Sequence, residues 1–120
     1  MRLSRSILVV LVLMVILGAS AIIYIKNSNN NTYKPGIWPE ADQAVAQAQY
    51  IYNQTKERGV DFKSGPCLSN ALIPGWVLDL SHSPREAVDN LPENQCRAYL
   101  EGTAKHFIEM DLQGNLLRVK

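Results

Sequence analysis

The sequence predicts an α+β protein in which an apolar N-terminal segment precedes one long amphipathic helix packed on a small antiparallel sheet. Three observations lead to this prediction. Residues 39–58 carry apolar side chains at helical spacing, residues 76–80 form an apolar run, and residues 106–119 contain two β-type runs joined by a Gly/Asn loop. Helical and strand patterns in separate parts of one small chain are typical of the α+β class.

The N-terminal segment has the length and composition of a membrane anchor. Residues 7–25 are 19 consecutive residues without a charge, and a helix of that length spans roughly 28 Å, close to the hydrocarbon thickness of a bilayer. Arg2 and Arg5 precede the run and Lys26 follows it. Because the positive charge is weighted to the start, we expect residues 1–26 to be a single-pass anchor with a cytoplasmic N-terminus and an extracytoplasmic C-terminal domain.

A cleaved signal peptide is the alternative interpretation of the same segment. A basic start, an apolar centre and the pattern Ala19-Ser20-Ala21 together match a cleavable leader. The apolar run continues beyond this pattern to Ile25, which favours a retained anchor. Under both interpretations the rest of the chain is exported, and cleavage near Ala21 would leave it secreted.

The exported part divides into a spacer and one small domain. Residues 27–38 are polar and rich in turn formers, and we expect a flexible spacer there. Residues 39–120 are expected to form a small exported α+β domain. Beyond residue 26 the chain has 9 basic and 11 acidic residues, a net charge of −2. This charge argues against nucleic-acid binding, which requires a basic surface.

The long helix has sequence signals at both ends. Pro39 suits the first helical position, Glu40 and Asp42 lie in the first turn, and Gly59 suits the position just past the end. One face is apolar and rich in alanine, which allows close approach to a partner surface. The residues of this face are Ala41, Ala44, Val45, Ala48, Ile51, Tyr52 and Thr55.

The C-terminus contains the clearest β signal. Residues 106–111 and 116–119 are β-type runs, and the loop between them contains Gly114 and Asn115. A loop of this length and composition predicts an antiparallel β-hairpin. Together with the strand at 76–80, the hairpin would form the sheet that the long helix covers.

Other segments carry weaker signals. The Ser-Pro-Arg-Glu sequence at residues 83–86 is a capping box and predicts a short helix that ends near Leu91. Residues 60–62 suit a short strand. The sequence does not decide the secondary structure of residues 67–73, where one helical turn is an option. Residues 92–101 suit either a second short helix or a strand.

The two cysteines predict a disulfide. Cys67 and Cys96 are the only cysteines of a small exported chain, and a bridge between them closes a loop of 30 residues. Such a bridge contributes roughly 3–4 kcal/mol in the chain-entropy model. The alternative is a thiol hydrolase with Cys67 as nucleophile and His106 as base, an order that occurs in papain-like and cell-wall-peptidase folds. None of the longer signatures of those folds is present.

The two histidines allow a divalent-metal site. His82 follows one predicted strand and His106 begins another, and Asp79, Glu109 and Asp111 lie nearby in sequence. These residue types are metal ligands, but no recognised ligand spacing such as H-E-x-x-H is present. The alternative is that each histidine makes one hydrogen bond at the end of a strand, and we predict no bound metal or cofactor.

Arg85 suggests either an anion site or a structural ion pair. It lies close in sequence to Asp79, Glu86 and Asp89, and an arginine held by carboxylates can bind an anionic ligand or fix a loop.

The candidate ligand-binding residues are therefore His82, Arg85 and His106. They would form one site only if the strand at 76–80 lies next to the C-terminal hairpin.

The C-terminal half also contains a string of residues that carries a resemblance. The string is Gly65, Pro66, Cys67, Leu68, Trp76, Asp79, His82, Pro84, Arg85, Asp89, Asn94, Gln95, Cys96, Gly102, His106, Phe107, Gly114 and Asn115. It resembles a group of small exported bacterial proteins of unknown function. The resemblance implies no activity, cofactor or catalytic residue.

From these observations we expect a non-catalytic binding or interaction module of the cell envelope. The membrane would be contacted through residues 7–25, and the partner would be an envelope protein or a glycan. The thiol hydrolase and the metal-binding domain are the alternatives.

Overall fold

A computed structural model describes residues 4–28 and 33–120, and the chain forms two compact units, residues 1–30 and 31–120. In the first unit, α1 (Arg5–Ser28) is a helix of 24 residues. Among the described residues, no helix combines the length and the apolar character needed to cross a membrane. The side chains of residues 20–28, which include the predicted cleavage site and the end of the predicted anchor, lie outside the description, as do residues 29–32 of the predicted spacer.

The predicted long helix is present in the second unit as α2 (Pro39–Glu57). Pro39 occupies the first turn, Trp38 is the N-cap and Arg58 the C-cap. Gly59 follows with a φ of 76°, a left-handed conformation that glycine adopts without steric cost. The apolar stripe faces the core as predicted, and its buried residues are Ala41, Ala44, Ala48, Tyr52 and Thr55.

The second unit contains a four-stranded sheet in the order β1-β2-β3-β4. Its strands are β1 (Cys67–Ile73), β2 (Trp76–Ser81), β3 (His106–Asp111) and β4 (Leu116–Val119). The α+β class is therefore confirmed. The β3–β4 hairpin is antiparallel, as predicted, and β1 pairs antiparallel with β2.

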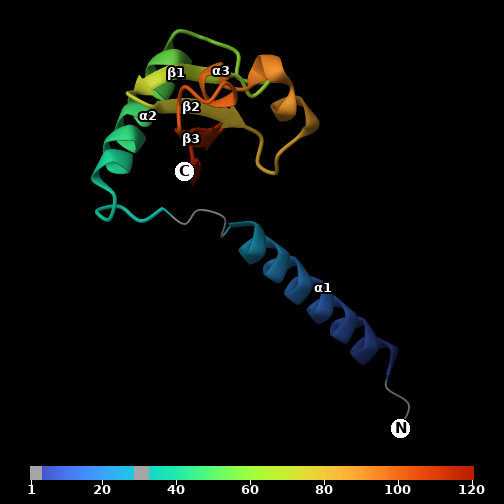
Figure 1. Ribbon diagram of the computed structural model, residues 1–120. Helices are drawn as coiled ribbons and strands as arrows, with labels where there is room; N and C mark the ends of the chain where they lie inside the picture. The colour runs from blue at the N-terminus through green and yellow to red at the C-terminus, as the bar shows by residue number, and fades with distance from the viewer. Residues whose placement is uncertain (1–3, 29–32) are drawn as a thin grey trace. The chain divides into compact units, whose positions relative to one another are not determined.

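The prediction of a purely antiparallel sheet is wrong, because β2 and β3 are parallel. Trp76 pairs with His106 and Ser81 with Asp111, so both strands begin at the same edge. Parallel neighbours require a crossover connection of a dozen or more residues. Here residues 82–105 form that connection, which leaves the end of β2 and returns through the short helix α3 (Arg97–Leu100) (Figure 1).

One local prediction is wrong, and the structure decides two segments that the sequence left open. Residues 67–73 form strand β1 rather than a helical turn, whereas residues 60–62 form no strand. Phe62 instead packs on Tyr52, with ring centroids 5.3 Å apart. Residues 97–100 are helical, which excludes the strand interpretation of this segment.

The predicted helix after residue 83 is a single 3-10 turn, Ala87–Asn90. The capping box is formed by Glu86 and Asp89 rather than by Ser83 and Glu86. The cause is visible at Asp89, whose carboxylate accepts a hydrogen bond from the backbone N–H of Glu86 at 2.7 Å. A second 3-10 turn, Pro92–Asn94, follows before α3.

The two faces of the sheet are covered by different elements. Alternate side chains of a strand point to opposite faces, and α2 packs on the face that carries Trp76, Leu78, Leu80, Ile108 and Met110, all fully or almost fully buried. The opposite face, here called the outer face, carries the intervening residues. Two of them, Val77 and Phe107, form a second, smaller apolar cluster with Cys96 and Ala104 of the crossover.

Candidate ligand pocket on the outer face

A pocket of about 150 Å³ opens on the outer face of the sheet. The strands supply its floor and the crossover supplies its walls. Its lining residues are Val77 and Asp79 of β2, Phe107 and Glu109 of β3, Arg118 of β4, and Arg85, Gln95, Cys96, Tyr99 and Leu100 of the crossover. A larger hollow of about 500 Å³ beside β1 has no ionisable residue in its lining. Unlike that hollow, the outer-face pocket combines apolar walls with both acidic and basic side chains.

A buried carboxylate holds two arginines at this pocket. Glu109 is 6% exposed, and its Oε2 accepts a hydrogen bond from Arg85 Nη1 and another from Arg118 Nη2, each at 2.8 Å. A buried acid of this kind requires compensating charge. Glu109 and Arg118 are direct partners in the β3–β4 register, so the hairpin itself brings them together.

The two arginines are held to different extents. Arg85 also donates from Nε to Asn90 at 2.9 Å and from Nη2 to the backbone oxygen of Asp89 at 3.2 Å, which fixes its guanidinium against the crossover. Arg118 is 48% exposed, and its guanidinium carbon lies 5.0 Å from the centre of the Phe107 ring. Among the described residues, its bond to Glu109 is the single hydrogen bond of this guanidinium. Most of its five N–H donors therefore remain available.

Asp79 is the unusual acid of the pocket. Burial and then the negative charge of Glu109 raise the pKa of Asp79 to about 7, against the opposing effect of Arg85 and of the Leu80 N–H. Its Oδ1 lies 3.9 Å from Cys96 Sγ. The carboxyl therefore changes charge close to neutral pH, a property that is common at functional sites.

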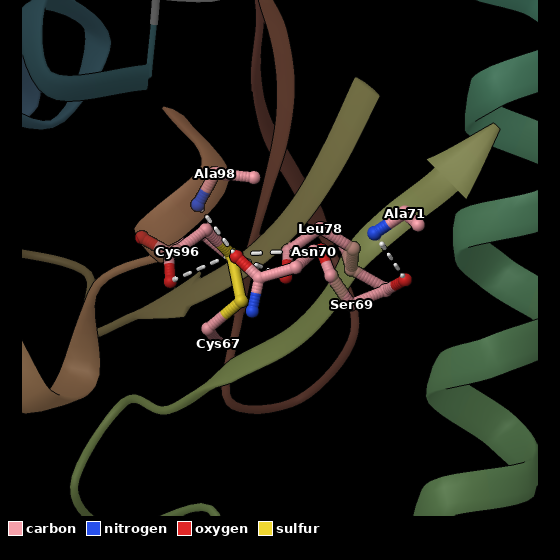
Figure 2. Close-up of a disulfide and its surroundings, with 8 residues drawn as sticks. Cys67, Ser69, Asn70, Ala71, Leu78, Cys96 and Ala98 are labelled. Atoms are coloured by element: carbon pink, nitrogen blue, oxygen red, sulfur yellow. Dashed lines mark hydrogen bonds between the residues drawn. A yellow bond between two sulfur atoms is a disulfide. The ribbon is translucent and has the colours of Figure 1, made fainter. Parts of the chain in front are cut away.

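The predicted disulfide reaches the pocket through Cys96, which is one of the lining residues. Cys67 at the start of β1 is bonded to Cys96 in the segment before α3, with a Cα–Cα distance of 4.9 Å. Figure 2 shows the bridge beside Asn70, whose Oδ1 accepts a hydrogen bond from the Ala98 N–H at 2.8 Å. These two connections tie the start of α3 to β1 and so fix the wall that carries Tyr99.

The disulfide also bears on the thiol and metal alternatives. Neither cysteine is free, so Cys67 has no thiol with which to act as a nucleophile in this state. Cys67, Asp79 and Cys96 do offer ligand atoms within 4.8 Å of one another. Sulfur atoms bonded to each other are not thiolates, and the thiolate is the form that ligates metal.

His82 lies beside the pocket, in a separate cluster around Asp89. Its Nδ1 is 2.8 Å from Asp89 Oδ1, and its backbone N–H donates to Asp89 Oδ2 at 3.1 Å. The hydrogen bond to Asp89 raises the pKa of His82. Burial works to raise the pKa of Asp89, but the hydrogen bonds from the Glu86 N–H and from His82 hold it below its ordinary value. Asp89 thus joins His82 and Glu86 at the first turn of the crossover.

His106 lies at the far end of the sheet from His82. It pairs with Trp76 at the start of β2, whereas His82 follows the last residue of β2. At about 3.3 Å per residue the two histidines are separated by roughly 17–20 Å along the strands. His106 stacks on Trp76 with ring centroids 4.6 Å apart and meets Trp38 edge-on at 5.2 Å.

The structure therefore does not bring the three candidate ligand-binding residues together. Arg85 lines the pocket, His82 supports the loop that carries Arg85, and His106 belongs to an aromatic cluster beside α2. A metal site shared by His82 and His106 is not assembled, because the strands that carry them are parallel.

Arg118 was not predicted as a pocket residue, and Glu109 was not predicted as the partner of two arginines. The alternation of side chains along the hairpin could have placed Phe107, Glu109 and Arg118 on one face. What the alternation could not supply was the parallel neighbour β2, which adds Asp79.

Comparison with known proteins adds no relative: no family model, curated protein or solved structure matches the chain.

Proposed function

We propose that the second unit is an exported, non-catalytic binding module and that the outer-face pocket is its ligand site. The observation that supports this most is the convergence, in one pocket of about 150 Å³, of the aromatic residues Tyr99 and Phe107 with the ionisable residues Asp79, Glu109 and Arg118. Apolar walls with a few placed polar groups are typical of small-molecule sites.

The size of the pocket limits what it can hold. A cavity of about 150 Å³ accommodates a group the size of benzene. The pocket would thus enclose one ring or one short side chain and leave the rest of a larger molecule outside. The T-shaped contact between Tyr99 and Phe107, at 5.0 Å, presents apolar and aromatic surface. This surface suits an apolar side chain or a small organic group of an envelope partner.

The disulfide supports the exported location in this proposal. Disulfides persist in oxidising compartments and are rare in the cytosol. Attachment to the membrane through residues 7–25, with the N-terminus inside, is the further part of the proposal, and it rests on the sequence. Intact-mass measurement of the native protein tests it: a retained anchor predicts the full-length mass, and loss of the residues up to Ala21 would replace the anchor with secretion.

Amide chemical-shift mapping of the full chain tests the pocket. The probes are benzoate, benzylammonium and benzamide, which share a ring and differ in charge. We expect at least one probe to shift the amide signals of Val77, Asp79, Phe107 and Glu109 in a saturable manner. If all three leave these signals in place, or if the shifts fall only on residues of the aromatic cluster around His106, the outer-face pocket is not the ligand site.

A further inference from the structure

We infer that the outer-face pocket binds a carboxylate group attached to an apolar body, and that Asp79 takes up a proton when this ligand binds. The inference rests on the proposed function of the pocket and adds the chemical class of the ligand. Its basis is the charge of the pocket in its two protonation states, together with the hydrogen-bond donors that remain available there.

The charge balance depends on Asp79 alone. Arg85 and Arg118 bring two positive charges and Glu109 one negative charge, and the three are joined by hydrogen bonds to one Glu109 oxygen. With Asp79 ionised the net charge is zero, and with Asp79 protonated it is +1. Net charge in a partly buried site is costly. An anionic ligand neutralises the protonated state, so that ligand and proton stabilise each other.

A cationic ligand would have the opposite effect. It would leave the pocket with a net charge of +1 when Asp79 is ionised and of +2 when it is protonated. It would also approach Arg118, which is part of the lining. The same count therefore disfavours an amine, and an uncharged ligand would leave the charge of either state unchanged.

The hydrogen-bond donors also suit a carboxylate. Among the described residues, the Arg118 guanidinium makes one hydrogen bond, to Glu109, and guanidinium groups bind carboxylates through paired N–H donors. A protonated Asp79 offers an O–H donor from the floor of the same pocket. The apolar body of the ligand would lie against Phe107 and Tyr99, which form the aromatic wall.

The groups that face Asp79 from each neighbouring element support Asp79 as the one group that takes up a proton. Glu109 faces it from β3 and Arg85 and Asp89 from the crossover, and each affects its pKa electrostatically. Arg118 of β4 and Tyr99 of α3 line the same pocket.

Among these neighbours, Asp89 of the crossover keeps its negative charge. Hydrogen bonds to Asp89 lower its pKa, so it stays ionised throughout the neutral range. The residues that β1 and the crossover contribute at the disulfide, Cys67 and Cys96, do not titrate while bonded.

Titration calorimetry of the full chain with benzoate tests the inference. At about pH 5.5 benzoate should bind about tenfold more tightly than at about pH 8, because Asp79, with a pKa of about 7, is protonated at the first pH and ionised at the second. Near pH 7, titrations in two buffers with different ionisation enthalpies should show net proton uptake. Equal affinity at both pH values, or proton release, would overturn the inference.

Single substitutions test the contributions of Asp79 and Arg118 to benzoate binding. Asp79→Asn should remove the pH dependence of benzoate binding. Arg118→Ala should weaken benzoate binding at least tenfold at about pH 5.5, the usual scale for a lost charged hydrogen bond. Arg97→Ala is the matched control, because Arg97 is 82% exposed and pairs with Glu101 outside the pocket.

The charged and neutral probes distinguish failure of the carboxylate inference from failure of the proposed ligand site. If benzylammonium or benzamide binds at the pocket and benzoate does not, the carboxylate inference is wrong and the pocket remains a ligand site. If Asp79→Asn retains the tenfold pH dependence, the proton is taken up elsewhere and the role of Asp79 is wrong. If no probe binds, both the inference and the proposed function are wrong.

Discussion

At the scale of single residues, the protonation state of the pocket residue Asp79 affects the stability of the fold. Its carboxyl is held between the disulfide and Glu109, and its pKa is raised to about 7 by burial and by that neighbouring charge. In an unfolded chain the same group titrates near pH 4. The folded state therefore binds a proton that the unfolded state has lost, across the pH range between these values.

This difference predicts a pH-dependent loss of stability that Asp79→Asn should remove. The favourable contribution of protonated Asp79 is fully present below about pH 4 and is lost as the pH rises through about 7. Each pKa unit corresponds to about 1.4 kcal/mol, and the two pKa values differ by about three units. The free energy of unfolding therefore falls by up to about 4 kcal/mol.

Urea unfolding followed by tryptophan fluorescence measures this effect at pH 4.5 and 8. The wild type and Asp79→Asn should have similar unfolding free energies at pH 4.5. At pH 8 Asp79→Asn should be more stable than the wild type. A variant that is less stable than the wild type at pH 8 would contradict the raised pKa of Asp79.

At the scale of elements, the crossover depends on a contact between its first turn and the chain before β1. Asp89 accepts hydrogen bonds from the N–H groups of His82 and Glu86 and lies against Gly65. Gly65 has a φ of 64°, and a Cβ there would lie 2.3 Å from Asp89 Oδ1 and 3.2 Å from the Leu80 oxygen. The position thus requires glycine for its backbone conformation and for space.

We predict that Gly65→Ala destabilises the protein clearly more than Gly75→Ala. Gly75 also has a positive φ, of 80°, but a Cβ there meets nothing within 4 Å. The control therefore carries the conformational cost of about 1–2 kcal/mol without the collision. The collision should add about 1–3 kcal/mol. Equal losses in thermal unfolding for the two variants would show that the contact with Asp89 does not constrain the crossover.

The elements also show what the sequence could predict. The helix α2 and the β3–β4 hairpin were predictable, because helical periodicity, end signals and a Gly/Asn loop are local. The parallel pairing of β2 with β3 was not, since it depends on the path of the irregular segment 82–105. For this reason Arg85 was identified as a candidate, whereas its meeting with Glu109 and Arg118 was not.

His106 illustrates the same limit. Its position at the start of a strand was predictable, and so was the presence of a second histidine near a strand end. Which end of the sheet each occupies depends on strand direction, and the parallel register places His106 beside Trp76 instead of His82. Residue type alone therefore suggested a metal site that the topology does not assemble.

At the scale of the whole domain, the disulfide joins parts that are far apart in the chain. Cys67 and Cys96 are separated by 29 positions and link β1 to the start of α3. The core of the second unit is small, and closing a loop of this length stabilises a protein by roughly 3–4 kcal/mol in the chain-entropy model. The bridge also fixes the crossover wall of the pocket.

We expect the double variant Cys67→Ala/Cys96→Ala to lose about 3–4 kcal/mol of unfolding free energy. Urea unfolding measures the loss, and reduction of the wild type under the same conditions should reproduce most of it. If removing both cysteines leaves the unfolding midpoint unchanged, the bridge does not stabilise the domain and its place beside Asp79 would need another explanation.

The most direct test of the pocket is the titration of the Asp79 side-chain carboxyl by ¹³C NMR in the full chain, with and without benzoate. The structure predicts a titration midpoint of about 7 without ligand. The proposed coupling of proton and carboxylate predicts that saturating benzoate moves this midpoint higher. A midpoint near 4 in the free protein, or one that falls when benzoate is added, would contradict the account.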